Sequence, residues 1–172
     1  MMEVILVNKK DEAIGQMEKI EAHQKGKLHR AFSIFLINDK MQILLQKRKL
    51  DKYHSGGLWS NACCSHPLPE EPTIDAAHRR LIEELNMHCK LEFVFSFIYK
   101  IGLENVIENE YDHVYIGKTN ETPNFNPKEI SEIKWVELDF LLSDLKLNPK
   151  NYSYWFHHIL TQHFKKIERY FK

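Results

Sequence analysis

The strongest constraint on the fold of this chain is an alternating apolar run in its second half. From Leu91 to Lys100 every second residue is large and apolar: Leu91, Phe93, Phe95, Phe97 and Tyr99. Because successive side chains of a strand point to opposite faces, this run predicts a β-strand with these five residues on one side. The β-branched run Val106–Ile116 predicts the next strand.

Shorter apolar runs alternate with helical patterns in the rest of the chain. Further strands are expected at Val4–Val7, Ala31–Ile37, Met41–Gln46 and Ile133–Val136, with Asn38–Lys40 forming a hairpin between the second and third of these. Helices are expected from Thr73, as the N-cap, to about Leu85, at Leu138–Leu145 and at Ser153–Phe171. Asn120–Lys128, with two prolines, is expected to be a loop. This order predicts an α+β fold with a mixed sheet.

Composition narrows the classes of function. The 172 residues, 43% of them hydrophobic, favour one domain spanning residues 1–172, and we expect a monomer, with a dimer as the alternative. We expect no membrane segment, since apolar runs fall short of the ~20 residues of a membrane span. The balance of 24 basic and 24 acidic residues argues against nucleic-acid binding. An odd count of three cysteines, two of them adjacent, favours a reducing, cytoplasmic setting.

Three short segments carry the side chains suited to chemistry. In Asn61–Pro67 the thiol of Cys64 lies two positions from the imidazole of His66. Glu108-Asn109-Glu110 falls within a predicted strand, so both carboxylates should leave the same face. His23 and His29 flank a basic segment that contains a glycine. Three imidazoles and two carboxylates suit one divalent ion, with a cysteine beside it.

Basic residues form a second pattern. Although the net charge is zero, they gather in three groups: Lys19 to Arg30, Lys47 to Lys52, and Arg79-Arg80. Lysine and arginine that converge on a small pocket suit a phosphate or a diphosphate. Taken singly, most of these side chains are expected to be solvated surface charges.

The predicted helix and the loop before it resemble a degraded Nudix box. Glu71, Arg79, Glu83 and Glu84 match the box, whereas Ser65 and Asn86 replace its glycines and Arg80 replaces a glutamate. The departures argue against pyrophosphate hydrolysis and fit the type 1 isopentenyl-diphosphate Δ-isomerases of the same superfamily. The motifs Asn-x-x-Cys-x-His-Pro, Glu-Asn-Glu, the paired N-terminal histidines and Tyr-Ser-x-Trp resemble that family, in the same order over nearly the whole chain.

The resemblance implies a fold, a reaction and a set of residues. The fold would be a Nudix-like mixed β-sheet sandwiched by helices, with N-terminal strands and a C-terminal helix added. The reaction would convert isopentenyl diphosphate to dimethylallyl diphosphate through a carbocation. Cys64 and Glu110 would each handle one proton, Tyr99 would relay or donate, and the Trp155 ring would face the cation.

The resemblance also implies two metal positions and an anion site. Manganese, zinc or magnesium would be bound by His23, His29, His66, Glu108 and Glu110. Glu84 would hold a second ion, magnesium, through the diphosphate. The diphosphate itself would contact Lys19, Arg48, Lys52 and Arg80.

The sequence leaves two alternative functions open. A Nudix hydrolase of a nucleoside diphosphate derivative would release phosphate or pyrophosphate, and a non-catalytic metal-binding domain would show neither activity. No flavin is expected, because no Gly-rich phosphate motif occurs. The metal and the basic side chains are expected to lower the pKa of Cys64. Buried structural roles are expected for Cys63 and Cys89, and surface or satisfied core positions for His54 and six other histidines.

Overall fold

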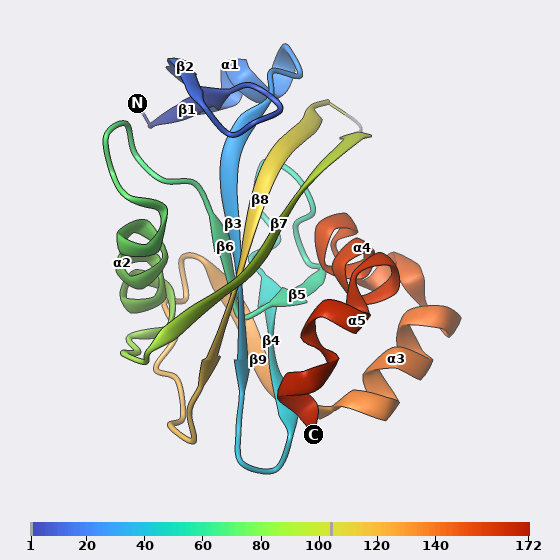
Figure 1. The fold of residues 1–172 in the computed structure, drawn as a ribbon. Helices are drawn as coiled ribbons and strands as arrows, with labels where there is room; N and C mark the ends of the chain where they lie inside the picture. The colour runs from blue at the N-terminus through green and yellow to red at the C-terminus, as the bar shows by residue number, and fades with distance from the viewer. Residues whose placement is uncertain (1, 104) are drawn as a thin grey trace.

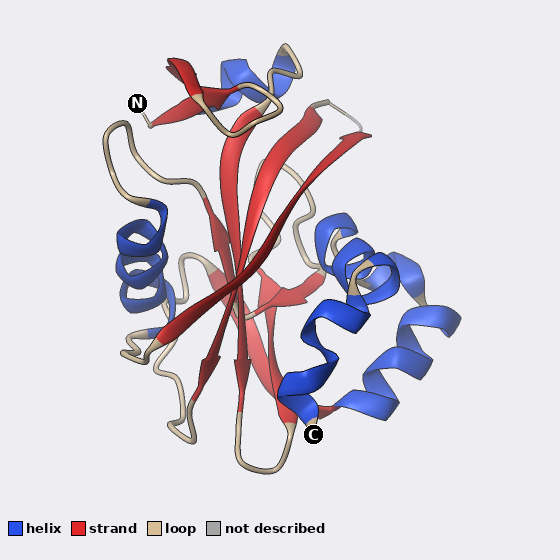
Figure 2. Ribbon diagram, viewed as in Figure 1, coloured by secondary structure: helices blue, strands red, loops and turns tan. Residues whose placement is uncertain are grey.

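A computed structural model describes residues 2–103 and 105–172. Within them, a nine-stranded mixed sheet lies between two helical layers (Figures 1 and 2). The strands are β1 (Glu3–Val7), β2 (Ala13–Glu18), β3 (His29–Ile37), β4 (Gln42–Arg48), β5 (Trp59–Asn61), β6 (Cys63–Ser65), β7 (Leu91–Gly102), β8 (Ile107–Lys118) and β9 (Ile130–Glu137). The helices are α1 (Lys19–Gln24), α2 (Thr73–Leu85), α3 (Leu138–Leu147), α4 (Tyr154–Gln162) and α5 (Phe164–Ile167), with 3-10 turns η1 (Pro149–Asn151) and η2 (Glu168–Phe171).

Strand β3 organises the sheet. It runs parallel to β8 along its whole length and antiparallel to β1, β4 and β6 at different points. Eight of its nine residues are buried, as expected for a strand covered on both faces. The parallel register places His29 beside Glu110, and the antiparallel register places Ser33 beside Cys64. The topology therefore brings three distant segments of the chain to one strand.

Two apolar cores cover the two faces of the sheet. One contains Phe32 and Cys63 and packs against α2, whereas the other contains Phe35 and packs against α3, α4 and α5. Figure 1 shows α2 alone on one side and the three C-terminal helices on the other. The predicted α+β arrangement of a mixed sheet sandwiched by helices is confirmed. None of the helices in the described ranges is long and apolar enough to cross a membrane.

The predicted alternation of β7 is interrupted by a β-bulge. The pairing with β8 shifts between Phe93 and Phe95, so Val94 is an extra residue on this strand. As a result, Leu91 packs in the core under α2, Phe93 is 51% exposed, and only Phe95, Phe97 and Tyr99 face the opposite core. The prediction that all five share one side was wrong, because a one-residue bulge exchanges the two faces of a strand.

Helix α2 ends where the sequence predicts, but its caps differ. Pro72 takes the N-cap position and Thr73 is the first helical residue, so the predicted Thr73 cap was wrong. At the other end Asn86 adopts a left-handed conformation (φ 52°), and its N–H donates to the carbonyl of Ile82. Asparagine tolerates this conformation better than other residues with a Cβ, so it can replace the glycine of the box.

Glu71 and Arg79, which match the box, form a paired ion bridge. Arg79 Nε lies 2.7 Å from Glu71 Oε1, and Arg79 Nη2 lies 2.8 Å from Glu71 Oε2. Glu71 also accepts a hydrogen bond from the N–H of Leu68. These two matching residues therefore tie the loop to the helix.

Several elements depart from the sequence prediction. The expected long C-terminal helix is interrupted at His163, which separates α4 from α5, and its last turn is the 3-10 turn η2. The short elements α1, β2, β5 and β6 were not predicted, since each has six residues or fewer and gives little periodic signal. The expected hairpin forms at Asn38–Met41, but β3 and β4 pair at Ile37 and Ile43 and then diverge to other partners.

Candidate active site

A pocket opens where β3, β6, β8, the segment after β4 and the start of α4 meet. It contains about 360 Å³ of space free of protein atoms, part of which is open to solvent. Its walls combine imidazoles, carboxylates, one thiol, two cationic side chains and aromatic rings. They are formed by Lys19, Phe32, Ser33, Arg48, Tyr53, His54, Cys64, Ser65, His66, Glu108, Glu110 and Trp155.

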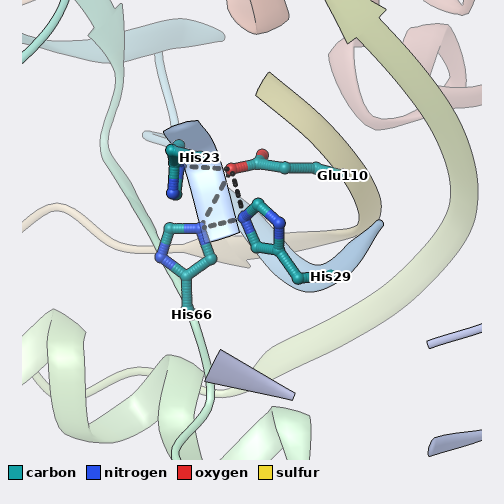
Figure 3. A group of neighbouring side chains, drawn as sticks. All are labelled: His23, His29, His66 and Glu110. Carbon is teal, nitrogen blue, oxygen red and sulfur yellow. Dashed lines mark hydrogen bonds and ion pairs between the residues drawn. The ribbon is translucent and has the colours of Figure 1, made fainter. Parts of the chain in front are cut away.

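Four of the five predicted metal ligands converge in one cluster (Figure 3), and two of them, His66 and Glu110, line the pocket. Glu110 Oε1 lies 2.9 Å from His66 Nε2, 3.5 Å from His29 Nε2 and 3.8 Å from His23 Nε2. The Nε2 atoms of His29 and His66 are 3.2 Å apart. All four residues are buried. A carboxylate oxygen and three ring nitrogens are thus aimed at a common centre.

The surroundings of these imidazoles favour metal ligation. Nδ1 of His23 lies 2.7 Å from the carbonyl of Lys19, and Nδ1 of His29 lies 2.8 Å from the carbonyl of Lys27. Each Nδ1 must therefore donate, which leaves the Nε2 lone pairs directed inward. Burial lowers the pKa of His23 to about 4 and that of His66 to about 3, so these rings are neutral near pH 7.

The carboxylate of Glu110 completes this donor set. Burial alone would raise its pKa, but the adjacent His29 and His66 rings hold the pKa well below its usual range. Neutral imidazoles with an ionised carboxylate are the forms that bind a divalent ion. The cluster fits a divalent metal.

Glu108, the fifth predicted ligand, lies in an adjoining group. Its Oε1 is 3.0 Å from His54 Nε2, and its Oε2 is 3.0 Å from the Tyr99 hydroxyl. The same hydroxyl lies 2.6 Å from Oε2 of Glu110, so Tyr99 connects the two carboxylates. Burial and the neighbouring Glu110 raise the pKa of Glu108 well above its usual range. The strand places both acids on one face, as predicted; they share Tyr99 as a partner, but Glu108 pairs with His54 and Glu110 with His66.

Cys63 and Cys64 point to opposite faces of β6. Cys63 is fully buried in the core beneath α2, whereas Cys64 lines the pocket, 3.8 Å from Arg48 Nη1. The predicted structural position of Cys63 is confirmed. Burial raises the pKa of the Cys64 thiol to about 12, although Arg48 acts in the opposite direction. The basic neighbours therefore do not produce the lowered pKa that the sequence suggested.

The Trp155 ring is fixed by a buried polar network. Its Nε1 donates to Asn61 Oδ1 at 3.2 Å, and the amide of Asn61 donates to the carbonyl of Cys63 at 2.7 Å. Ser153, at the N-cap of α4, lies 2.9 Å from Ser60 through their hydroxyls. The Asn61 and Tyr-Ser-x-Trp motifs thus contact each other, and the Arg48 guanidinium lies 5.1 Å from the centre of the Trp155 ring.

The four predicted diphosphate contacts divide into two pairs. Lys19 and Arg48 line the pocket. Lys52 and Arg80 meet instead at the carboxylate of Glu129, outside the pocket lining. Burial and the neighbouring cations Lys52, Arg48 and Arg80 lower the pKa of Lys19 to about 8, so the fields of all four groups overlap. Glu84, the predicted second metal position, accepts a hydrogen bond from Arg80 at 2.5 Å.

Sequence reasoning missed two pocket residues on the segment after β4. His54 was expected at the surface or satisfied in the core, yet its side chain is 7% exposed and faces Glu108 in the pocket. The Tyr53 hydroxyl lies 3.3 Å from His23 Nε2. The available signal was their position between Lys52 and the Gly-Gly-Leu-Trp run, in the stretch that joins Arg48 to Cys64.

A buried acid that contacts a pocket residue was also missed. Asp112 continues the face of Glu108 and Glu110 along β8 and accepts a hydrogen bond from Ser33 at 2.8 Å. Burial raises its pKa to about 8. The signal was present in the sequence, because Asp112 follows Glu110 by the two-residue step of a strand.

Comparisons with known proteins agree with this geometry. Residues 27–157 match the NUDIX domain family. The chain is 46% identical to an isopentenyl-diphosphate Delta-isomerase of Pectobacterium atrosepticum, over 91% of this chain and 88% of that protein. It is 49% identical to isopentenyl-diphosphate Delta-isomerase 2 of Photorhabdus laumondii, over 92% and 90% respectively.

A solved structure gives the same result for the fold. A protein of Deinococcus radiodurans superimposes with a TM-score of 0.72 at 23% identity, over 85% of this chain and 90% of that one. The resemblance predicted from the sequence motifs is confirmed, and the names of the relatives favour an isomerase over the hydrolase alternative. The chain belongs to the isopentenyl-diphosphate Delta-isomerase family and has the Nudix fold.

Proposed function

We propose that this protein isomerises isopentenyl diphosphate to dimethylallyl diphosphate. The main support is a single pocket that holds two proton-carrying groups from different strands and an aromatic face. Cys64 comes from β6 and Glu110 from β8, which flank β3 on its two sides. Trp155 joins them from α4.

The reaction needs two proton transfers and no co-reactant. One group adds a proton to the terminal methylene carbon, using the electrons of the double bond, and the adjacent tertiary carbon becomes cationic. The other group removes a proton from the carbon next to the oxygen-bearing one, and those electrons form the new double bond. Cys64 and Glu110 exchange these protons with the substrate, and Tyr99, 2.6 Å from Glu110, relays a proton to that carboxylate.

The remaining pocket residues protect and hold the reacting groups. The π face of Trp155 stabilises the cation by about 2 kcal/mol once water is excluded. Lys19 and Arg48, with Lys52 and Arg80 nearby, bind the diphosphate through charge-assisted hydrogen bonds. These side chains orient the allylic carbons between Cys64 and Glu110.

His23, His29, His66 and Glu110, with Glu108 beside them, would hold a manganese, zinc or magnesium ion. Glu84, together with the diphosphate, would hold a second ion, magnesium. When bound, such ions supply positive charge that orients Glu110 and neutralises the diphosphate. We further propose that residues 1–172 act as one domain, as a monomer, in the cytoplasm; three free cysteines suit that reducing compartment.

The test is incubation of purified protein with isopentenyl diphosphate and magnesium. Formation of dimethylallyl diphosphate, followed by NMR of the allylic protons, is the expected result. Release of phosphate or pyrophosphate from a nucleoside diphosphate derivative, without isomerisation, would instead identify a hydrolase. Against that alternative, the guanidinium of Arg80 pairs with two of the three glutamates of the box, at 2.8 Å from Glu83 and 2.5 Å from Glu84.

A further inference from the structure

The carboxylate of Glu129 has no role in the reaction described above, yet it lies among the cations of the diphosphate site. It belongs to the turn that precedes β9, where its N–H donates to the carbonyl of Asn126 at 3.0 Å. Its own carbonyl accepts from the N–H of Lys49 at 3.0 Å, and the N–H of Asn126 donates to the carbonyl of Glu84 at 2.8 Å. The backbone of Glu129 is therefore fixed between the end of α2 and the segment after β4.

The side chain of Glu129 joins two of the predicted diphosphate contacts. Its Oε2 forms an ion pair with Lys52 Nζ and lies 3.8 Å from Arg80 Nη2. The side chain is 27% exposed, so water screens these interactions only in part. An anion that binds Lys52 and Arg80 must compete with this carboxylate.

The charges around Lys52 and Arg80 determine which anion can compete with Glu129 for these two cations. Outside the cluster around Glu110, four cations, Lys19, Arg48, Lys52 and Arg80, face three carboxylates, Glu83, Glu84 and Glu129, which leaves an excess of one positive charge. A diphosphate ester carries more negative charge than this excess neutralises, and bound magnesium would supply the difference. Without Glu129, the cations alone would neutralise more of the free diphosphate.

We propose that Glu129 is a specificity-determining residue that makes this site prefer the magnesium complex of a diphosphate over the free diphosphate. It does so by holding Lys52 and Arg80 and by reducing the positive charge available to an anion without metal. The proposal rests on the proposed function, because it takes Lys52 and Arg80 as diphosphate contacts. It adds to that function a residue that selects the magnesium-bound form of the substrate.

The experiment measures binding of inorganic pyrophosphate by calorimetry, with and without magnesium, to the full chain and its variants. Glu129→Gln removes the charge and keeps the shape of the side chain. We expect it to bind pyrophosphate about tenfold more tightly than the wild type without magnesium, the scale of one charge-assisted contact. With magnesium, Glu129→Gln and the wild type should bind pyrophosphate with the same affinity. The factor by which magnesium increases the affinity should therefore be about tenfold smaller in Glu129→Gln than in the wild type.

Glu132→Gln is the matched control. Glu132 lies on β9, the strand that follows the turn of Glu129, and its carboxylate is 4.0 Å from Lys47, which is not one of the four cations. This variant should bind pyrophosphate as the wild type does. Thermal unfolding of both variants establishes that they are folded.

Two results would overturn the proposal. Unchanged binding by Glu129→Gln would mean that the carboxylate does not compete with the anion, and weaker binding in both conditions would mean that it serves only to place Lys52 and Arg80. If Glu129→Gln fails to fold, Glu129→Asp replaces it, because this substitution moves the carboxylate back by one methylene. Without magnesium, Glu129→Asp should bind pyrophosphate more tightly than the wild type, by less than tenfold. No increase in its affinity overturns the proposal. A wild type that does not isomerise its substrate refutes the proposed function, whereas an active wild type with unaltered Glu129→Gln binding refutes only this inference.

Discussion

Replacement of Trp155 separates the cation-stabilising role of its ring from its role in packing. The side chain is 4% exposed, and its Nε1 donates to Asn61 Oδ1 at 3.2 Å. Both Trp155→Phe and Trp155→Leu remove this hydrogen bond, and Asn61 Oδ1 keeps its contact with the Ser60 hydroxyl at 3.0 Å. The two variants therefore share the polar loss and differ mainly in the π face.

The magnitudes follow from these contacts. Loss of the hydrogen bond costs about 1 kcal/mol, which lowers kcat/KM about fivefold if it falls entirely on the transition state. Loss of the π face costs about 2 kcal/mol more, or roughly a further thirtyfold. The ring face already accommodates a cation, since the Arg48 guanidinium lies 5.1 Å from its centre. Trp155→Phe should thus be roughly thirtyfold more active than Trp155→Leu.

The assay is steady-state isomerisation, with the thermal unfolding of each variant measured in parallel. Both substitutions leave a cavity, so both should lower the free energy of unfolding, by about 1–3 kcal/mol. If the two variants have equal kcat/KM, the ring only fills space and the argument for a carbocation facing Trp155 is refuted.

Three further predictions address the thiols, the metal and the end of α2. Cys64→Ala should remove nearly all activity and Cys64→Ser most of it, whereas Cys63→Ala should cost only about 1 kcal/mol of stability. An epoxide analogue of the substrate should label Cys64. A label on Cys63 in the peptide map would contradict this assignment. His66→Ala should lower metal content, measured by mass spectrometry, together with activity; full activity of chelator-treated protein without added ions would show that no metal is needed. Asn86→Ala should destabilise the fold by about 1 kcal/mol in urea unfolding, because alanine is strained at φ 52°, while Asn86→Gly should be neutral or stabilising; equal losses in both variants would rule out backbone strain as the cause.

The sequence by itself determined the features that depend on local periodicity. The two-residue step of a strand places Glu108 and Glu110 on one face and turns Cys63 away from Cys64, and both predictions are confirmed. The limits of α2 and the order of the main strands also follow from local patterns. These properties need only the geometry of one element, so neighbouring residues suffice to specify them.

Tertiary structure decided how these elements combine into a site. The parallel pairing of β3 with β8 brings His29 beside Glu110, more than 80 residues later in the chain, and the pairing of β3 with β6 brings Cys64 beside Ser33. The bulge at Val94 reverses the faces of β7, which no alternation in the sequence indicates.

Irregular segments placed the remaining residues of the site. The segment after β4 places His54 in contact with Glu108, and the turn before β9 places Glu129 in contact with Lys52 and Arg80. Such segments lack a repeating pattern, because their backbone is held by individual long-range hydrogen bonds, such as that between Lys49 and Glu129, rather than by a regular ladder. Their side chains therefore acquire partners only when the whole sheet has formed.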